Sequence, residues 1–130
     1  MILDSSAIVG VLRTEPEAPA LLRAIESAGA CHVSAVTYVE AAIVIDGGGD
    51  AVASRRFDDF FRISHASIET VTARQAQIAR QAYRDFGKGR HKAGLNFGDC
   101  FAYALAKDLD EPLLFKGTDF KHTDIEIEEY

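Results

Sequence analysis

The sequence predicts an α/β fold with a mainly parallel central sheet. Short apolar runs typical of buried strands recur along the chain, and each is followed by a longer stretch with apolar residues at helical spacing. Parallel strands need such crossover connections, because the chain must return to the same end of the sheet. We find no repeat or linker in the 130 residues and therefore expect a single domain over 1–130.

The boundaries of the elements follow from helix caps, glycines and prolines. Pro16 is expected in the first turn of the second helix, Ser34 or Thr37 caps the third, and Thr72 with Gln75 forms a capping box. The expected elements are a strand at 1–3, helices at 5–13 and 16–28, a strand at 32–34, helices at 37–46 and 50–65, a strand at 68–71, helices at 72–86 and 97–109, a strand at 113–115 and an edge strand at 125–127.

Composition excludes several classes of protein. A hydrophobic content of 48% and a charged content of 26% are typical of globular proteins. The apolar start at 1–12 is too short to span a bilayer and lacks a basic leader, so we expect a cytoplasmic protein without a membrane segment. Cys31 and Cys100 form no CxxC pair, which indicates reduced thiols and no zinc site.

Four acids lie where predicted strands end or helices begin. Asp4 ends the first strand and Glu40 lies early in the third helix. Asp99 opens the helix after the glycine-rich loop, and Asp119 follows the last buried strand. Because ligands of parallel α/β sheets gather at the carboxyl ends of the strands, we expect these carboxylates to share one cleft.

Clustered carboxylates repel one another unless a cation neutralises them. Magnesium is the expected ion because it prefers oxygen ligands, and manganese accepts the same ligands. We expect Asp4 and Asp99 as direct ligands, Glu40 near a metal-bound water or a second ion, and Asp119 completing the pocket. Such a centre can activate water and stabilise charge on phosphorus, which is the chemistry of phosphodiester hydrolysis.

Two polar residues beside these acids have two possible roles. The Ser6 hydroxyl could lie beside a metal-bound water, and Asn96 could orient Asp99. Capping of the following helix explains either residue equally simply.

The net charge of −6 disfavours binding to nucleic acid, but one segment of the chain is basic. Lys88, Arg90 and Lys92 lie in the glycine-rich loop 87–94 and could contact RNA phosphates while a cation neutralises the acidic cleft. The alternative is a solvated, mobile loop without a ligand.

Four segments together resemble the VapC family of PIN-domain toxins, in the order found in that family. They are "ILDSSAIVGVL", "VSAVTYVEAAIVI", "LNFGDCFAYALAK" and "PLLFKGTDFKHTDI", and they cover most of the chain. The resemblance implies a ribonuclease H-like, three-layer α/β/α sandwich. It also implies that Asp4, Glu40 and Asp99 are the invariant acids, that Asp119 is the less regular fourth acid, and that Ser6 is the frequent hydroxyl.

The chain departs from the wider PIN pattern at one position. Two acids normally flank one residue before a phenylalanine there, whereas Gly117 replaces the first of them, which argues against a complete second metal site. The resemblance further implies an Mg²⁺-dependent endoribonuclease that cuts structured RNA such as tRNA or rRNA. It implies a homodimer and inhibition by a VapB-like antitoxin, often through an arginine that enters the acidic cleft.

Two other classes of function stay open at this stage. A receiver-like phospho-acceptor domain has similar length and a lysine after a late strand, as Lys116 is here. It needs adjacent acids after the first strand, whereas this chain has Asp4-Ser5-Ser6. A non-catalytic protein-interaction module is the second alternative, and the presence of all four acids argues against it.

Overall fold

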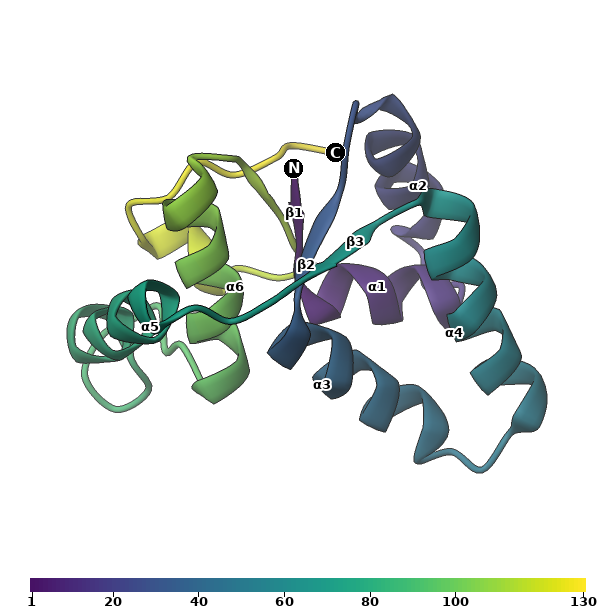
Figure 1. The fold of residues 1–130 in the computed structure, drawn as a ribbon, viewed down its shortest axis with the longest axis horizontal. Helices are drawn as coiled ribbons and strands as arrows, with labels where there is room; N and C mark the ends of the chain where they lie inside the picture. Colours follow the sequence, from purple (N-terminus) through teal and green to yellow (C-terminus); the bar gives the residue numbers. More distant parts are fainter.

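A computed structural model describes all residues, 1–130 (Figure 1), and its single sheet has four strands. The strand order is β3-β2-β1-β4, and every pair is parallel. The α/β fold with a parallel sheet is therefore confirmed. The strands are β1 (Ile2–Leu3), β2 (His32–Ser34), β3 (Ser67–Glu69) and β4 (Leu113–Leu114).

Six α-helices and one short 3₁₀-helix connect and cover the strands. Their ends agree with the predicted elements to within a few residues. The helices are α1 (Ser5–Leu12), α2 (Ala18–Ser27), α3 (Ala35–Asp46), α4 (Ala51–Ser64), α5 (Ala73–Phe86), α6 (Phe97–Leu109) and the 3₁₀-helix η1 (Asp119–His122).

The two faces of the sheet pack against different helices, which gives the three layers seen in Figure 1. Ile2 and Leu113 point into a core with α5 and α6, whereas Leu3 and Leu114 point into a core with α1 to α4. All four side chains are fully buried. This alternation follows from the two-residue period of a strand, so two-residue strands are long enough to join both cores.

Three local predictions need correction. Pro16 lies before α2, and the proline of its first turn is Pro19. The predicted edge strand 125–127 reduces to a single bridge between Ile127 and Leu113, because the residues before it turn away after η1. The third strand ends at Glu69, since Thr70 and Val71 already lead into the N-cap of α5 at Thr72.

The other helix caps agree with the predicted chemistry. The Ser34 side chain accepts the amide N–H of Val36 at the start of α3, and Thr72 accepts that of Gln75 at the start of α5. No helix is both long and apolar enough to cross a membrane. Cys31 and Cys100 are free, buried thiols, as expected.

Candidate active site at the carboxyl ends of the strands

Asp4 occupies the turn between β1 and α1 and is almost fully buried, with 2% of its surface exposed. Its Oδ2 accepts the Ser6 amide N–H at 2.9 Å and the Ser6 hydroxyl at 2.6 Å. Asp4 is therefore the N-cap of α1, and the prediction that Ser6 could cap this helix is wrong. Its other oxygen, Oδ1, is buried and has no hydrogen-bond partner.

Ser6 links Asp4 to the end of β4. The backbone N–H of Lys116 donates to the Ser6 hydroxyl oxygen at 2.9 Å, and this hydroxyl in turn donates to Asp4. Two strand ends are thus joined through one side chain, which fixes the orientation of the Asp4 carboxylate. The Lys116 ammonium does not enter the acidic centre, because it pairs with Glu15 and Glu17.

Asp99 lies in the first turn of α6 and is held by Asn96 in a complete capping box. The Asp99 N–H donates to Asn96 Oδ1 at 2.9 Å, and the Asn96 N–H donates to Asp99 Oδ2 at 2.8 Å. Asn96 therefore both caps the helix and orients Asp99, so the two predicted roles are not alternatives. Asp99 is 8% exposed.

Glu40 projects from α3 toward the start of α6, where Gly98 makes room for it. A Cβ atom at position 98 would lie 2.3 Å from Glu40 Oε2, closer than unbonded atoms approach. The residue next to Asp99 must therefore lack a side chain if the Glu40 carboxyl is to keep this place. Like Asp4 Oδ1, Glu40 Oε2 is a buried carboxylate oxygen without a hydrogen-bond partner.

Asp119 begins η1, after the left-handed turn at Gly117, and its side chain is exposed. Its charge contributes to raising the pKa of Asp4 and of Asp99. The structure thus brings all four predicted acids to the same edge of the sheet, with three buried or half-buried and Asp119 at the rim.

The electrostatics of the cluster favour a bound cation. Burial raises the pKa of Asp99 to about 6, and the charges of Asp4, Glu40 and Asp119 add to the rise. Burial also raises the pKa of Asp4, with Asp119 adding to it, and that of Glu40, with Asp4 adding to it. The carboxyl groups of Asp4, Glu40 and Asp99 are thus harder to ionise here than in water.

The donor set suits a hard divalent ion. It consists only of carboxylate oxygens, and two of these are buried without a partner, which is costly in a metal-free protein. No three acid, His or Cys side chains lie close enough together to ligate one ion in this arrangement. A cation held by fewer protein ligands and by water fits these residues, and this is the usual coordination of magnesium.

The basic loop is an ordered structure that folds back on α5. The Lys88 N–H donates to the Leu95 carbonyl, and the Leu95 N–H donates to the Phe86 carbonyl, both at 3.0 Å. The predicted loop is therefore closed by main-chain hydrogen bonds. The side chains of Lys88, Arg90 and Lys92 are exposed and form no ion pair with any acid of the chain, so they are free to contact an anion.

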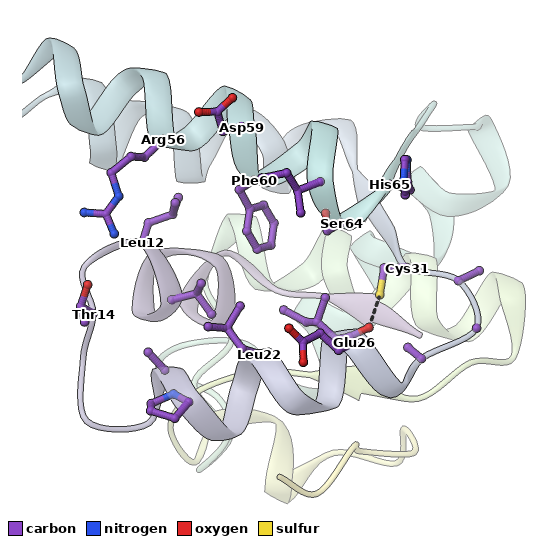
Figure 2. A pocket seen from close by; sticks show the side chains of 18 residues that line it. Leu12, Thr14, Leu22, Glu26, Cys31, Arg56, Asp59, Phe60, Ser64 and His65 are labelled. Atoms are coloured by element: carbon purple, nitrogen blue, oxygen red, sulfur yellow. Dashed lines mark hydrogen bonds between the residues drawn. The ribbon is translucent and has the colours of Figure 1, made fainter.

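A large cavity lies between α1, α2 and α4 (Figure 2). Its volume is about 820 Å³, and Leu12, Leu22 and Phe60 are among the apolar side chains that line it. None of the four acids lines this cavity, which therefore lacks the chemistry of the acidic centre.

Gly98 is the residue of the site that the sequence patterns did not single out. Glycine is an unusual choice inside a helix, where it costs roughly 1 kcal/mol relative to alanine. Its position directly before Asp99 is therefore a signal that a close neighbour requires the space, although the neighbour could not be named without the structure.

Comparison with known proteins agrees with the geometry. The PIN domain family matches residues 1–126. Ribonuclease VapC28 of Mycobacterium tuberculosis is 50% identical over 127 residues, which cover 97% of this chain and 96% of the relative. Ribonuclease VapC of Mycolicibacterium smegmatis is 45% identical over 125 residues, which cover 96% and 97% of the two chains.

Solved structures share the fold. The crystal structure of Mycobacterium tuberculosis VapC20, described as a sarcin-ricin loop cleaving toxin, has a TM-score of 0.76 at 13% identity and covers 95% of each chain. A toxin-antitoxin complex from Klebsiella pneumoniae has a TM-score of 0.73 at 17% identity and covers 99% of this chain and 97% of its match. The receiver alternative is therefore wrong, and the chain belongs to the PIN domain family and, within it, to the VapC ribonucleases.

Proposed function

We propose that this chain is a metal-dependent endoribonuclease, the toxin of a VapBC pair, and that its acidic centre hydrolyses phosphodiester bonds in RNA. One observation carries the proposal. Carboxylates from four separate segments meet at one sheet edge, and buried oxygens of Asp4 and Glu40 have no partner. Relatives up to 50% identical over nearly the whole chain are named ribonucleases. We take residues 1–130 as one PIN domain, and the cytoplasmic location stays a prediction.

Asp4 and Asp99 would hold the cation, which we propose to be Mg²⁺, with Mn²⁺ as a substitute. The bound ion supplies Lewis acidity and an activated water. The protein supplies rigidity, because Ser6 fixes one carboxylate and Asn96 fixes the other. Glu40 would orient a water molecule toward the phosphate, and Asp119 would complete the pocket at its exposed rim.

Structured RNA, such as tRNA or rRNA, is the proposed substrate. Lys88, Arg90 and Lys92 would contact its phosphates, since they are the exposed, unpaired cations of one ordered loop. Replacing all three by alanine should weaken RNA binding and reduce the slope of log affinity against log salt by roughly one for each phosphate that is no longer neutralised. Equal affinity at every salt concentration would show that the loop does not bind RNA.

We further propose a homodimer through the exposed side of α3. Val39 and Ile43 lie one helical turn apart there and are 52% and 66% exposed, which a monomer seldom leaves uncovered. Sedimentation should give a dimer for the native chain and a monomer for Ile43→Asp. Replacing Ile63, which is 67% exposed on α4, by aspartate is the matched control and should leave the dimer intact.

A cognate VapB-like antitoxin is the proposed protein partner. The apolar cavity between α1, α2 and α4 offers a surface for an amphipathic segment (Figure 2), and a cationic side chain of the same partner would neutralise the acidic centre. Leu22→Asp should weaken the complex without affecting RNA cleavage by the free protein.

A cleavage assay on total RNA tests the enzyme against a non-catalytic binding module. Activity with Mg²⁺ should vanish on addition of a chelator and should fall at least about 100-fold in Asp4→Asn, the magnitude typical of losing one electrostatic group of an active site. Asp58→Asn, which removes an exposed acid on α4, is the control and should leave the rate unchanged. Absence of cleavage with every divalent ion would support the module.

A further inference from the structure

A second groove, of about 600 Å³, lies between α5 and α6, and Asn96, the N-cap of α6, forms part of its lining. Small side chains, Ala76 and Ala79, form part of its lining. The larger side chains that line it include Arg80, Tyr83, Lys88, Asn96, Phe97 and Phe101.

Two exposed aromatic rings line this groove. Tyr83 is 43% exposed, and its ring is held against the backbone of Gly87, where an added Cβ would lie 2.7 Å from it. Phe97 is 72% exposed and rests edge-on against Phe101, with ring centroids 5.0 Å apart. Rings that are both exposed and held in place can bind a flat aromatic ligand at little cost in side-chain entropy.

Cations surround the same rings. Arg80 and Lys88 line the groove, and the Arg90 guanidinium lies 5.7 Å from the centre of the Tyr83 ring. None of these three forms an ion pair, whereas Arg62, Arg74, Lys107 and Lys116 elsewhere in the chain do. In a protein of net charge −6, an unpaired cluster of this kind is complementary to an anion.

Phe97 also lines a groove against α3, and the side chains of that groove are of a different kind. It is lined by Val36, Val39, Ile43 and Val44 of α3, and its only charged residue is Glu40. That surface suits another apolar protein surface. The groove between α5 and α6 combines aromatic rings with positive charge, which suits a base and its phosphates.

Asn96 connects the groove to the acidic centre. It lines the groove, and its side-chain oxygen accepts the N–H of Asp99. We propose that the groove binds a nucleobase from an unpaired, single-stranded segment of the RNA substrate, stacked against Tyr83, next to the phosphate that the carboxylates engage. The proposal rests on the proposed ribonuclease function and adds a site that reads or anchors a base.

Binding can be measured apart from cleavage in the Asp4→Asn background. The probes are a short single-stranded RNA and an oligomer of the same length with abasic sites, titrated at one salt concentration. Tyr83→Leu should weaken binding of the RNA by about 5- to 150-fold, the range that corresponds to one stacked base. Tyr130→Leu is the matched control, because this tyrosine is 46% exposed and distant in sequence, and it should change nothing.

A fluorescent variant reports stacking directly. The chain contains no tryptophan, so Tyr83→Trp introduces a single indole, whose emission should be quenched by the RNA and not by the abasic oligomer. Equal binding of both oligomers, or unchanged affinity in Tyr83→Leu, would overturn the proposal. So would a loss of affinity that appears only together with a changed sedimentation coefficient, since the groove would then be a protein contact.

The base site and the nuclease activity can fail separately. If the native chain with Mg²⁺ cuts no RNA but the binding pattern holds, the base site stands and the nuclease proposal falls. If the native chain cuts RNA and Tyr83→Leu binds and cuts equally well, the base site is wrong and the nuclease stands.

Discussion

Two groups of acids at the sheet differ in their electrostatics. Glu69 is the last residue of β3, and its carboxylate contacts the first residues of β2 and β3: His32 Nδ1 lies 2.8 Å from Glu69 Oε1 and 2.8 Å from the Ser67 hydroxyl. The hydrogen bonds from Ser67 and His32 lower the pKa of Glu69. In the acidic centre, burial and neighbouring acids raise the pKa of Asp4 and of Asp99.

The difference separates residues that stabilise the fold from residues that the fold must hold in place. A paired carboxylate is easier to ionise in the folded state and adds stability, whereas a buried, like-charged one subtracts it. Such a cluster persists only because the packing around it is stable enough to hold it. Strongly raised acid pKa values in a cleft are therefore typical of functional sites.

Gly98→Ala, in the acidic centre, should give the largest change in RNA cleavage. The new methyl group would occupy the space of the Glu40 carboxyl, which lies at the tip of a flexible side chain and can swing away. We expect RNA cleavage to fall by about 10- to 100-fold while the thermal midpoint changes little, because alanine is a better helix former than glycine. Cleavage rates and thermal unfolding of the same preparation measure both.

A double-mutant cycle identifies the cause. In the Glu40→Ala background, Gly98→Ala should have no further effect on cleavage and should stabilise the protein, since nothing occupies the space any longer. If Gly98→Ala lowers activity equally in both backgrounds, the glycine serves another purpose than making room for Glu40.

Asp99→Asn should stabilise the metal-free protein at neutral pH. The pKa of Asp99 is raised from 3.8 to about 6, so ionising it in the folded state costs up to about 3 kcal/mol. This penalty is absent below the unfolded pKa, grows as the pH rises to about 6, and is complete above that. Asparagine can still accept the Asn96 N–H and carries no charge.

Urea unfolding in chelator at pH 4 and pH 7.5 measures this effect as the difference between Asp99→Asn and the native chain. The gain should be about 2 to 3 kcal/mol at pH 7.5 and small at pH 4. Saturating Mg²⁺ should reverse the order at pH 7.5, because the cation stabilises only the chain that binds it. A gain that is equal at both pH values would mean that charge is not its cause.

The sequence was enough to predict the sheet and the four acids, for a physical reason. Strand ends and helix starts are local features, and acids at such points meet in any parallel sheet. The contacts between segments were not predictable. Neither the hydroxyl of Ser6 between Asp4 and β4 nor the fit of Glu40 against Gly98 leaves a local pattern.

The contacts of the basic loop and of the chain end could not be predicted for the same reason. The glycines at 87, 89 and 94 predicted a loop, and the segment is one, but its closure through Leu95 depends on the burial of that residue in the core. Alternation at 125–127 predicted a strand, but the pairing is limited to one bridge between Ile127 and Leu113, made by main-chain hydrogen bonds of Glu126 and Glu128 to Leu113. Local composition limits the structures that a segment can form, and contacts with residues distant in sequence determine which of these it forms.

Glu69→Gln tests the paired carboxylate and should have the smallest effect. The ionised carboxylate is stabilised in the folded state, so its contribution is present above the unfolded pKa of about 4.5 and is lost as the pH falls below it. Because the pair is partly exposed, we expect a loss below about 1 kcal/mol at pH 7, measured by urea unfolding.

The pH dependence of Glu69→Gln has the opposite sign to that of Asp99→Asn, and this makes the pair informative. Acidification should erase the cost of one substitution and the gain of the other, while RNA cleavage stays unchanged in Glu69→Gln. Glu126→Gln, an exposed acid without an ion pair, is the control for loss of charge alone. A drop in cleavage in Glu69→Gln would mean that Glu69 and the acidic centre are coupled, and the division between stabilising and functional acids would then not hold for this protein.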